Sequence, residues 1–233
     1  MFDLDFAPER DADAIRQSRV GEHLCSQFAA VAKDRAASSA PKRLVDFFVA
    51  LTLLVLFLPG FVLIALMIKA ETPGPVFFRQ RRTGLGGKIF TIVKFRTMRV
   101  AEDDHCVRAA RRTDPRITWV GEMLRRTSLD ELPQLFNVLK GDMSMVGPRP
   151  HALAHDLEYG RRIPNYPLRF RVRPGITGLA QVRGLRGGIE SDADMHRRVA
   201  ADNEYIEQWN GPFGDLVIVF RTIPVLLTKT NAY

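Results

Sequence analysis

The chain of 233 residues is long enough to bury one hydrophobic core, so a single domain with attachments is the expected organisation. A net charge of +8 and a pI near 9.9 predict anionic partners such as phospholipids, phosphorylated small molecules or nucleic acid. Cys25 and Cys106 lie far apart without CxxC spacing, which argues against a disulfide framework and a thiolate metal site. His151 and His155 have the i,i+4 spacing of a metal pair, but a polar or loop-supporting role is expected of them.

Residues 1–41 are a polar N-terminal tail rich in alanine and serine. The first twenty residues carry five acids and no apolar segment, so no signal peptide is expected. Apolar residues between Ile15 and Val31 hint at a weak amphipathic helix. A poorly ordered tail is at least as well supported by this composition.

An apolar run from Phe47 to Ile68 follows, interrupted only by Thr52 and by Pro59-Gly60. Its twenty-two residues exceed the number needed to span a membrane, which is roughly 20. The run is apolar on all sides, whereas a core helix would be shorter and striped. It therefore predicts membrane insertion.

The geometry of this insertion depends on Pro59, which should break or kink the helix near its centre. Cations flank both sides, with Lys42 and Arg43 before the run and further basic residues after it, whereas a spanning helix usually has its basic bias on one side. Each half is long enough to reach the middle of a hydrocarbon layer of ~30 Å and turn there. We therefore expect residues 42–70 to form a re-entrant helix hairpin broken at Pro59, with a proline-kinked span as the alternative.

Residues 71–233 are expected to form a compact domain that begins with a small, basic β element. Val76 to Phe78 and Lys88 to Met98 have the composition of strands, and the glycine-rich Gly84 to Gly87 lies between them. Seven Lys or Arg residues and no acid occur between residues 76 and 100. Such a one-sided run beside a membrane segment favours contact with lipid or substrate phosphates. The glycine loop alone is weak evidence, since it lacks the established phosphate-binding patterns.

Two adjacent acids, Asp130 and Glu131, stand in a strongly basic stretch. Two carboxylates among cations are either structural ion pairs or a site for an anionic substrate. The segment has the composition of a helix start, where the helix dipole favours the ionised carboxylate that a nucleophile or a metal ligand needs. Ser128 with Glu131 fits a capping box, while Asp130 as N-cap would place Pro133 within the first turn. The sequence leaves both capping schemes open.

The rest of the sequence after residue 118 predicts several helices and two loops that contain arginine. Trp119 to Arg126, Pro133 to Lys140 and residues 190–227 have helical patterns, and the last of these has a broad apolar face suited to the core or to a membrane interface. Prolines on both sides of Arg149 stiffen its backbone, which suits bidentate phosphate contact. A second loop, Arg171 to Gly178, has an ordinary Pro-Gly turn as its simplest interpretation.

Together these features resemble the bacterial sugar transferase family, the monotopic polyprenyl-phosphate sugar-1-phosphate transferases, over roughly residues 42–233. The matching blocks, in order, are Lys42-Arg43-Leu44-Val45-Asp46, the proline-broken apolar run, Gly74 to Gln80, Lys94-Phe95-Arg96-Thr97-Met98, Ser128 to Gln134, Val146 to Pro150, Arg173 to Gly178 with Gln181, and Asn231-Ala232-Tyr233. Pro148 to Ala152 and the last block are similar to the glucose-1-phosphate transferases of that family. Leu58-Pro59 stands where the family usually has Ser-Pro, and Ala180 and Arg183 to Arg186 also depart from the common pattern.

The resemblance implies a two-step transfer, which starts exopolysaccharide or other glycan synthesis at the bacterial inner membrane. Asp130 would attack the sugar-bearing phosphate of a UDP-sugar and release UMP, and undecaprenyl phosphate would then attack the aspartyl-phosphosugar. Glu131 and Mg²⁺ would organise the phosphates, with Asp130 as the metal contact. The implied phosphate-binding cations are Lys94, Arg96, Arg149 and Arg173. Glucose is the expected sugar and galactose the nearest alternative.

The predicted fold class is therefore α+β and mainly helical, with a re-entrant membrane hairpin and a compact cytoplasmic catalytic domain at 71–233 that contains a small β element and interfacial amphipathic helices. The expected partners are a UDP-sugar, undecaprenyl phosphate and membrane lipid, and a homodimer is left open. The alternative is a non-catalytic, membrane-anchored scaffold or regulator whose basic face recruits partners and whose acids cap a helix. Nucleic-acid binding rests on charge alone and is not expected.

Overall fold

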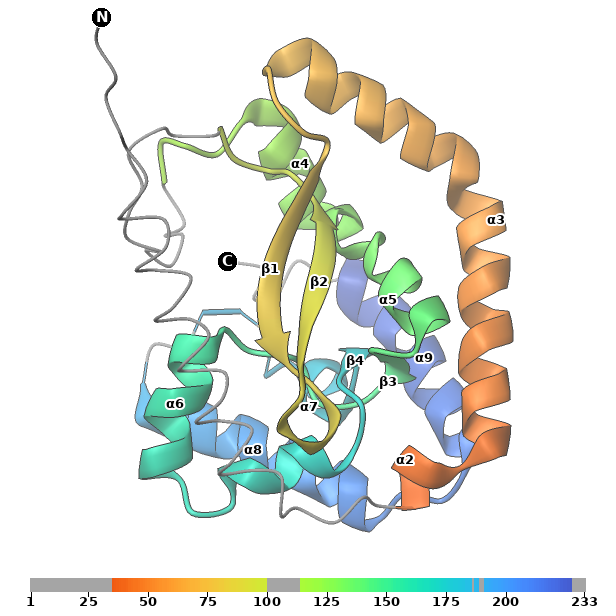
Figure 1. Cartoon of the computed structure of the whole chain (residues 1–233), viewed down its shortest axis with the longest axis vertical. Coiled ribbons are helices and arrows are strands. Elements are labelled where there is room, and N and C mark those ends of the chain that lie inside the picture. Colours follow the sequence, from red (N-terminus) through yellow and green to blue (C-terminus); the bar gives the residue numbers. More distant parts are fainter. Residues whose placement is uncertain (1–34, 100–113, 186, 189–190, 228–233) are drawn as a thin grey trace, which may run out of the picture.

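The computed structural model describes residues 35–99, 114–185, 187–188 and 191–227 (Figure 1). The helix expected between Ile15 and Val31 and the closing block Asn231-Ala232-Tyr233 lie outside the described residues. Within the described part, the fold is mainly helical α+β with two small two-stranded sheets, as predicted. The helices are α2 (Arg35–Ser38), α3 (Ala40–Glu71), α4 (Trp119–Thr127), α5 (Gln134–Lys140), α6 (Leu153–Arg162), α7 (Leu179–Val182), α8 (Asp192–Glu207) and α9 (Pro212–Leu227).

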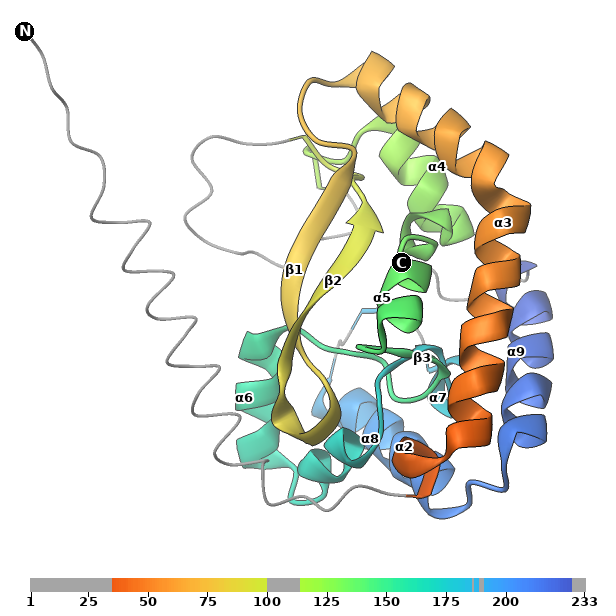
Figure 2. The same cartoon turned by 45° about the vertical axis from the view of Figure 1, so that its right-hand side comes forward.

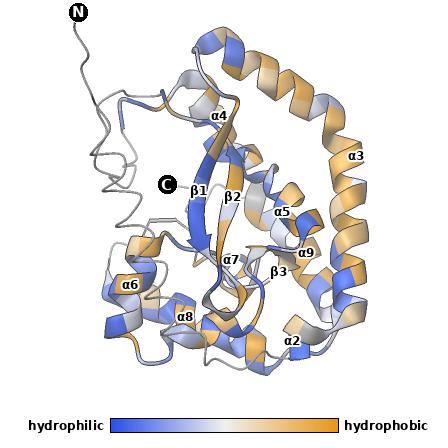
Figure 3. Ribbon diagram, in the orientation of Figure 1, coloured by the Kyte–Doolittle hydropathy of each residue, from blue (hydrophilic) through white to orange (hydrophobic). Residues whose placement is uncertain are grey.

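The apolar run forms most of α3, a single helix of 32 residues. Ser39 caps its N-terminus, because the side chain accepts a hydrogen bond from the Lys42 amide at 3.2 Å. By length and composition, α3 is long and apolar enough to cross a membrane, and most of its apolar segment is exposed. Figure 3 shows that apolar residues make up most of the length of this helix. The exposed large side chains are Leu44, Phe47, Phe48, Leu51, Val55, Leu56, Phe57, Leu58, Val62, Leu63 and Leu66.

Pro59 lies inside α3, and the helix continues through it. Its ribbon bends past the middle, so that the C-terminal part leans across the molecule toward α4 (Figures 1 and 2). Proline removes one backbone hydrogen bond and is the ordinary cause of such a bend. The predicted kink is therefore present, but the two halves of the helix do not fold back on each other as a hairpin.

Both ends of α3 are attached to the same domain. At its C-terminal end, Glu71 accepts hydrogen bonds from the backbone amides of Trp119 and Val120 at the start of α4, at 2.6 and 3.1 Å. In between, one face of the helix is buried, for example at Ala50 and Phe61. The helix is thus packed on the domain along one side and exposed on the other.

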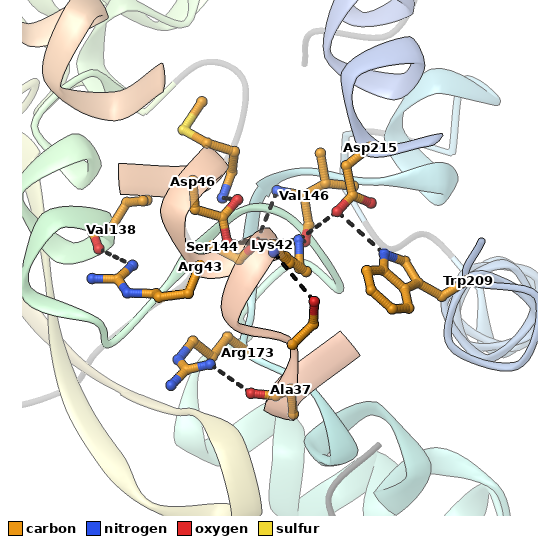
Figure 4. Close-up of polar contacts among 12 residues, drawn as sticks. Ala37, Lys42, Arg43, Asp46, Val138, Ser144, Val146, Arg173, Trp209 and Asp215 are labelled. Carbon is orange, nitrogen blue, oxygen red and sulfur yellow. Dashed lines mark hydrogen bonds and ion pairs between the residues drawn. The ribbon is translucent and has the colours of Figure 1, made fainter. Parts of the chain in front are cut away.

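The N-terminal end of α3 is held by a buried ion cluster (Figure 4). Lys42 Nζ lies 2.6 Å from Asp215 Oδ2 of α9 and 3.6 Å from Asp46, and it donates to the carbonyl of Val146. Arg43 donates to the carbonyls of Val138 and Leu139 at the end of α5. Lys42 and Arg43 flank the apolar run, as predicted, and both side chains bind protein groups of the domain.

The predicted β element is an antiparallel hairpin of β1 (Phe77–Thr83) and β2 (Ile89–Phe95). Its turn contains Gly86 with φ of 63°, a left-handed conformation that glycine adopts without strain. Asn137 of α5 fixes the hairpin, since its side chain accepts from the Val93 amide at 3.0 Å and donates to the Thr91 carbonyl at 2.7 Å. This contact sets β2 beside α5.

The second sheet is a short parallel pair, β3 (Ser144–Val146) and β4 (Gly175–Thr177). It brings the loop after β3 against the loop before β4. Glycine is required at this crossing: a Cβ on Gly147 would lie 2.4 Å from the carbonyl oxygen of Arg173. The two arginine loops recognised in the sequence therefore cross each other.

The helices predicted from the C-terminal pattern are α8 and α9. The α9 helix runs beside the N-terminal half of α3 (Figures 1 and 2) and exposes apolar side chains along one face. These are Phe213, Val217, Phe220 and Ile223. The α9 helix therefore has an exposed apolar face, as expected of an amphipathic helix, and its place at a membrane interface stays a prediction.

The Lys42→Met variant is expected to be strongly destabilised. Removing the ammonium leaves the buried carboxylates of Asp46 and Asp215 without their cation, which costs about 3–5 kcal/mol. Thermal and denaturant unfolding of the detergent-solubilised protein measure the loss. Lys140→Met is the control, because the Lys140 side chain is 72 % exposed in its pair with Asp142 and should change stability by less than about 0.5 kcal/mol. Equal effects of the two variants would contradict this account of the cluster.

Candidate active site

The acid pair lies on a single 3-10 turn, Leu129–Glu131, between α4 and α5. Ser128 enters this turn in the left-handed region, with φ of 59°, and its side chain makes no capping hydrogen bond. The α5 helix begins at Gln134, with Pro133 as its N-cap. Both capping schemes considered for the sequence are therefore wrong: the chain ends α4 at Ser128 and turns before α5 starts.

Glu131 is bound by cations from two separate elements. Lys94 Nζ of β2 lies 2.9 Å from its Oε1. Arg149, in the loop after β3, donates from Nη1 to Oε2 at 2.9 Å and from Nη2 to Oε1. The Glu131 side chain is only 13 % exposed, so these bonds act in a partly dehydrated site. Burial alone would raise the pKa of Glu131, but the charges and hydrogen bonds of Arg149 and Lys94 outweigh it and hold the pKa well below its ordinary value.

Asp130 has a different environment. Burial, together with the negative charge of Glu131, raises the pKa of Asp130 to about 6, although Lys94 and Arg149 oppose the shift. No hydrogen bond or ion pair to its carboxylate occurs within the described ranges. The expectation that its surroundings favour the ionised form is therefore wrong, but the carboxylate is still charged above that pH. The two adjacent acids thus differ: Glu131 is engaged by cations, and Asp130 has a carboxylate that can react or bind a ligand.

The predicted cations divide into two groups. Lys94 and Arg149 meet at the acid pair. Arg96 is buried and donates to Thr72 and to the carbonyl of Pro73, at the end of α3. Arg173 donates to the carbonyls of Gly141 and Ala37, both at 3.0 Å. The structure therefore does not bring Arg96 and Arg173 to the acid pair, because both arginines hold main-chain carbonyls, and their expected role in phosphate binding stays a prediction.

The acid pair offers few ligands for a divalent cation. Among the residues that the structure describes, no group of three His, Cys, Asp or Glu side chains could hold a metal ion by itself. Mg²⁺ is usually held by one or two carboxylates together with substrate phosphates and water. Asp130 supplies one such carboxylate, whereas the oxygens of Glu131 are engaged by Lys94 and Arg149. The site therefore fits a cation held chiefly by a bound substrate.

His151 and His155 do not form a metal pair in the described structure. His151 is buried and its Nδ1 lies 2.8 Å from the Tyr166 hydroxyl and 3.0 Å from Arg169 Nη1. Burial and the charge of Arg169 lower the pKa of His151 well below its ordinary value. The loop-supporting role expected of this histidine is confirmed. Arg169 and its buried partner Asp202 were missed, because no motif or spacing marks them in the sequence.

The site adjoins the exposed apolar surface of α3. Phe136, in the first turns of α5, is partly exposed, and its ring lies edge-on to Phe61 of α3 with centroids 6.0 Å apart. Phe61 follows the bend at Pro59. An acid pair with two bound cations, placed beside an apolar helix, suits the class of membrane-associated proteins that bind phosphorylated ligands.

Comparison with known proteins agrees with this class. The chain matches the model of the Bacterial sugar transferase family over residues 37–229. It is 56 % identical over 199 residues to the UDP-glucose:undecaprenyl-phosphate glucose-1-phosphate transferase of Caulobacter vibrioides, covering 85 % of this chain and 74 % of that protein. It is 51 % identical over 182 residues to the protein of the same name from Escherichia coli K12, covering 78 % of this chain but 39 % of that protein. Exopolysaccharide production protein PSS of Rhizobium leguminosarum is 43 % identical over 199 residues, covering 82 % of this chain and 98 % of that protein. The chain belongs to the bacterial sugar transferase family.

The Asp130→Asn variant is expected to be more stable than the native protein at neutral pH. The pKa of Asp130 is raised to about 6, so protonation of this carboxyl stabilises the fold at low pH and that contribution is lost as the pH rises through about 6. Asparagine carries no charge, and at pH ~7.5 the variant should gain on the order of 1–3 kcal/mol. The gain should disappear toward pH ~4, near the ordinary pKa of an aspartate.

Unfolding measured across this pH range tests the prediction. Asp192→Asn, on the exposed first turn of α8, is the control and should show no such pH-dependent gain. A variant at position 130 that is less stable than the native protein at neutral pH would contradict the assigned environment of Asp130.

Proposed function

We propose that this protein transfers glucose-1-phosphate from UDP-glucose to undecaprenyl phosphate, with release of UMP, as the first membrane step of exopolysaccharide synthesis. The names of the relatives from Caulobacter vibrioides and Escherichia coli support the donor, the acceptor and the sugar. Galactose is the nearest alternative sugar. A relative from Aeromonas hydrophila, 44 % identical over 192 residues, is named for the transfer of N-acetylgalactosamine phosphate, so membership of the family does not fix the sugar.

The observation that carries the proposal is the contrast between the two acids. Asp130 has no protein partner within the described ranges, while its neighbour Glu131 holds Lys94 and Arg149 close by. A nucleophile for phosphorus needs a free carboxylate oxygen, and it needs positive charge around the phosphoryl group that it attacks. Asp130 supplies the carboxylate, and its neighbour Glu131 holds Lys94 and Arg149, which supply the positive charge.

In the first step, an oxygen of Asp130 forms a bond to the sugar-bearing phosphorus as the bond from that phosphorus to the UMP oxygen breaks. UMP leaves with the bonding electrons, and the sugar phosphate remains on Asp130 as an acyl phosphate. In the second step, a phosphate oxygen of undecaprenyl phosphate attacks the same phosphorus, and the Asp130 carboxylate is released. The charge that spreads over the phosphoryl oxygens in each step is stabilised by Lys94 and Arg149.

Mg²⁺ bound to Asp130 and the substrate phosphates would supply further neutralisation of their charge. Glu131 is assigned to hold Lys94 and Arg149 rather than to transfer a proton, because its pKa is held well below the ordinary value. Phosphate binding by Arg96 and Arg173 is not part of this proposal, since both guanidinium groups are bonded to backbone carbonyls.

We also propose that the domain rests on the cytoplasmic face of the inner membrane, with α3 entering one leaflet and both of its ends on the same side. Three features support this arrangement. Lys42 and Glu71, near opposite ends of α3, are bonded to the same domain, and one face of the helix packs on that domain. The α3 ribbon, which contains Pro59, bends past its middle and leans over the domain toward α4 (Figure 1). The exposed apolar faces of α3 and α9 are the surfaces available to lipid. A site on this face can meet a soluble nucleotide sugar and a membrane-bound phosphate.

The alternative, a non-catalytic scaffold whose acids cap a helix, has less support. Neither acid caps α5, whose N-cap is Pro133. A scaffold also gives no reason for Asp130 to carry a partly buried charge with no partner within the described ranges, which costs stability.

Release of UMP is the first test of the proposed reaction. Detergent-solubilised protein supplied with UDP-glucose, undecaprenyl phosphate and Mg²⁺ is expected to release UMP, and Asp130→Asn is expected to lower the rate by at least about a thousandfold. Asp192→Asn should retain the native rate and serves as the matched control. Undiminished UMP release by the Asp130 variant would contradict the mechanism, and no release by the native protein would favour the scaffold.

Single-cysteine labelling tests the topology. In a variant with Cys25 and Cys106 replaced by serine, new cysteines at Ala40 and Pro75, both exposed positions on either side of the apolar helix, are expected to react with an impermeant maleimide from the same side of the membrane. The arrangement follows from the attachment of both helix ends to one domain. Labelling from opposite sides would show a span and contradict the proposed placement.

A further inference from the structure

The loop that presents Arg149 is held by its carbonyl groups. Pro148 and Pro150 have no N–H, so the loop offers mainly acceptors to the rest of the protein. All three consecutive carbonyls accept hydrogen bonds. The donors are the Gly175 amide to Pro148 at 2.9 Å, Arg169 Nη2 to Arg149 at 2.6 Å, and Arg82 Nη1 to Pro150 at 3.3 Å. The main chain under the Arg149 side chain is thus fixed at three successive points.

The middle donor, Arg169, comes from the interior of the protein. It is 3 % exposed and its Nε donates to Asp202 of α8, itself 2 % exposed, at 2.8 Å. Its guanidinium also lies over the ring of Tyr166, 5.0 Å from the centroid. Burial alone would lower the pKa of Arg169, but Tyr166 and Asp202 outweigh it and raise the pKa, so the group stays charged. A charged donor makes the stronger kind of hydrogen bond to the Arg149 carbonyl.

His151, beside Arg169, helps to orient the Arg169 guanidinium. Arg169 has no acceptor, so its Nη1 must donate to His151 Nδ1, 3.0 Å away. His151 is therefore neutral, with its proton on Nε2. Tyr166 completes the cluster by donating to Asp156 at 2.7 Å. Every donor group of Arg169 is thus committed: Nε to Asp202, Nη1 to His151 and Nη2 to the carbonyl of Arg149.

We propose that Arg169, oriented by Asp202 and His151, is a positioning residue for the transfer reaction, which holds the main chain of Arg149 so that its guanidinium reaches Glu131 and the substrate phosphate. The expected effect on kcat rests on the proposed function. The expected effect on the position of Arg149 rests on geometry alone. A buried ion pair is by itself weak evidence for stability. The hydrogen bond from Arg169 to the Arg149 carbonyl couples the Arg169–Asp202 ion pair to the acid pair, Asp130 and Glu131.

A double-mutant cycle between positions 169 and 149 tests the kinetic consequence. Arg169→Lys is expected to lower kcat about tenfold or more, because a small misplacement of Arg149 is costly. In an Arg149→Lys background, the same change should lower kcat less than about twofold, since the group being positioned is already lost. Arg43→Lys is the matched control: Arg43 also binds two backbone carbonyls, and its replacement should lower Tm while kcat well below Tm is unchanged.

A second double-mutant cycle, between positions 169 and 131, is measured by Tm and does not require enzymatic activity. If Arg169 sets Arg149 against Glu131, the loss of Tm caused by Glu131→Gln should fall by about half or more in the Arg169→Lys background. Equal losses of Tm in both backgrounds, or an equal loss of kcat in the presence and absence of Arg149, would overturn the positioning role. A native protein that releases no UMP but shows coupled losses of Tm would instead contradict the proposed function and leave the positioning role standing.

Discussion

The structure of the site depends on one buried carboxylate, that of Glu131, bound from two sides by Lys94 and Arg149. Lys94 is carried by the β1–β2 hairpin, and Arg149 is carried by the loop that leaves the β3–β4 pair. Glu131 itself belongs to the turn between α4 and α5. One ion triad therefore fixes three parts of the chain that are far apart in sequence. Removing one charge from such a triad would leave the others uncompensated in a partly dehydrated place, which is expected to destabilise the site.

The same triad accounts for the state of Asp130. Asp130 is partly buried beside the negative charge of Glu131, whose carboxylate engages both cations, and the pKa of Asp130 is raised to about 6. An acid in this state is unfavourable for folding at neutral pH. It is also a group whose negative charge is relieved when its oxygen forms a bond to phosphorus or when a divalent cation binds, so the cost to stability and the capacity for chemistry have the same physical origin.

Much of this site could be predicted from the sequence, and the failures are informative. The acid pair, Lys94 and Arg149 were placed together correctly, and the bend at Pro59 and the basic hairpin were expected from local composition. The cap was mispredicted because Ser128 adopts a left-handed conformation, which composition does not reveal. Arg96 and Arg173 lie away from the acid pair, which the sequence could not reveal because arginines that hold backbone carbonyls look the same in sequence as arginines that hold phosphate.

The remaining errors concern contacts between distant segments. Lys42 was interpreted as a flank of the membrane helix, whereas its partner Asp215 is 173 residues away. Arg169 and Asp202 could not be recognised for the same reason, since their importance depends on a carbonyl in the loop after β3. Local pattern predicted the elements and the reactive residues, and only the three-dimensional contacts revealed what holds the reactive residues in place.

The central claim is that Asp130 is the residue that accepts the sugar phosphate. Mass spectrometry of the native protein incubated with the UDP-sugar and no acceptor lipid tests it most directly. The account predicts an added hexose phosphate on the peptide that contains Asp130, which disappears when undecaprenyl phosphate is supplied. Release of UMP with no adduct on the protein, or with the adduct on another residue, would contradict the account.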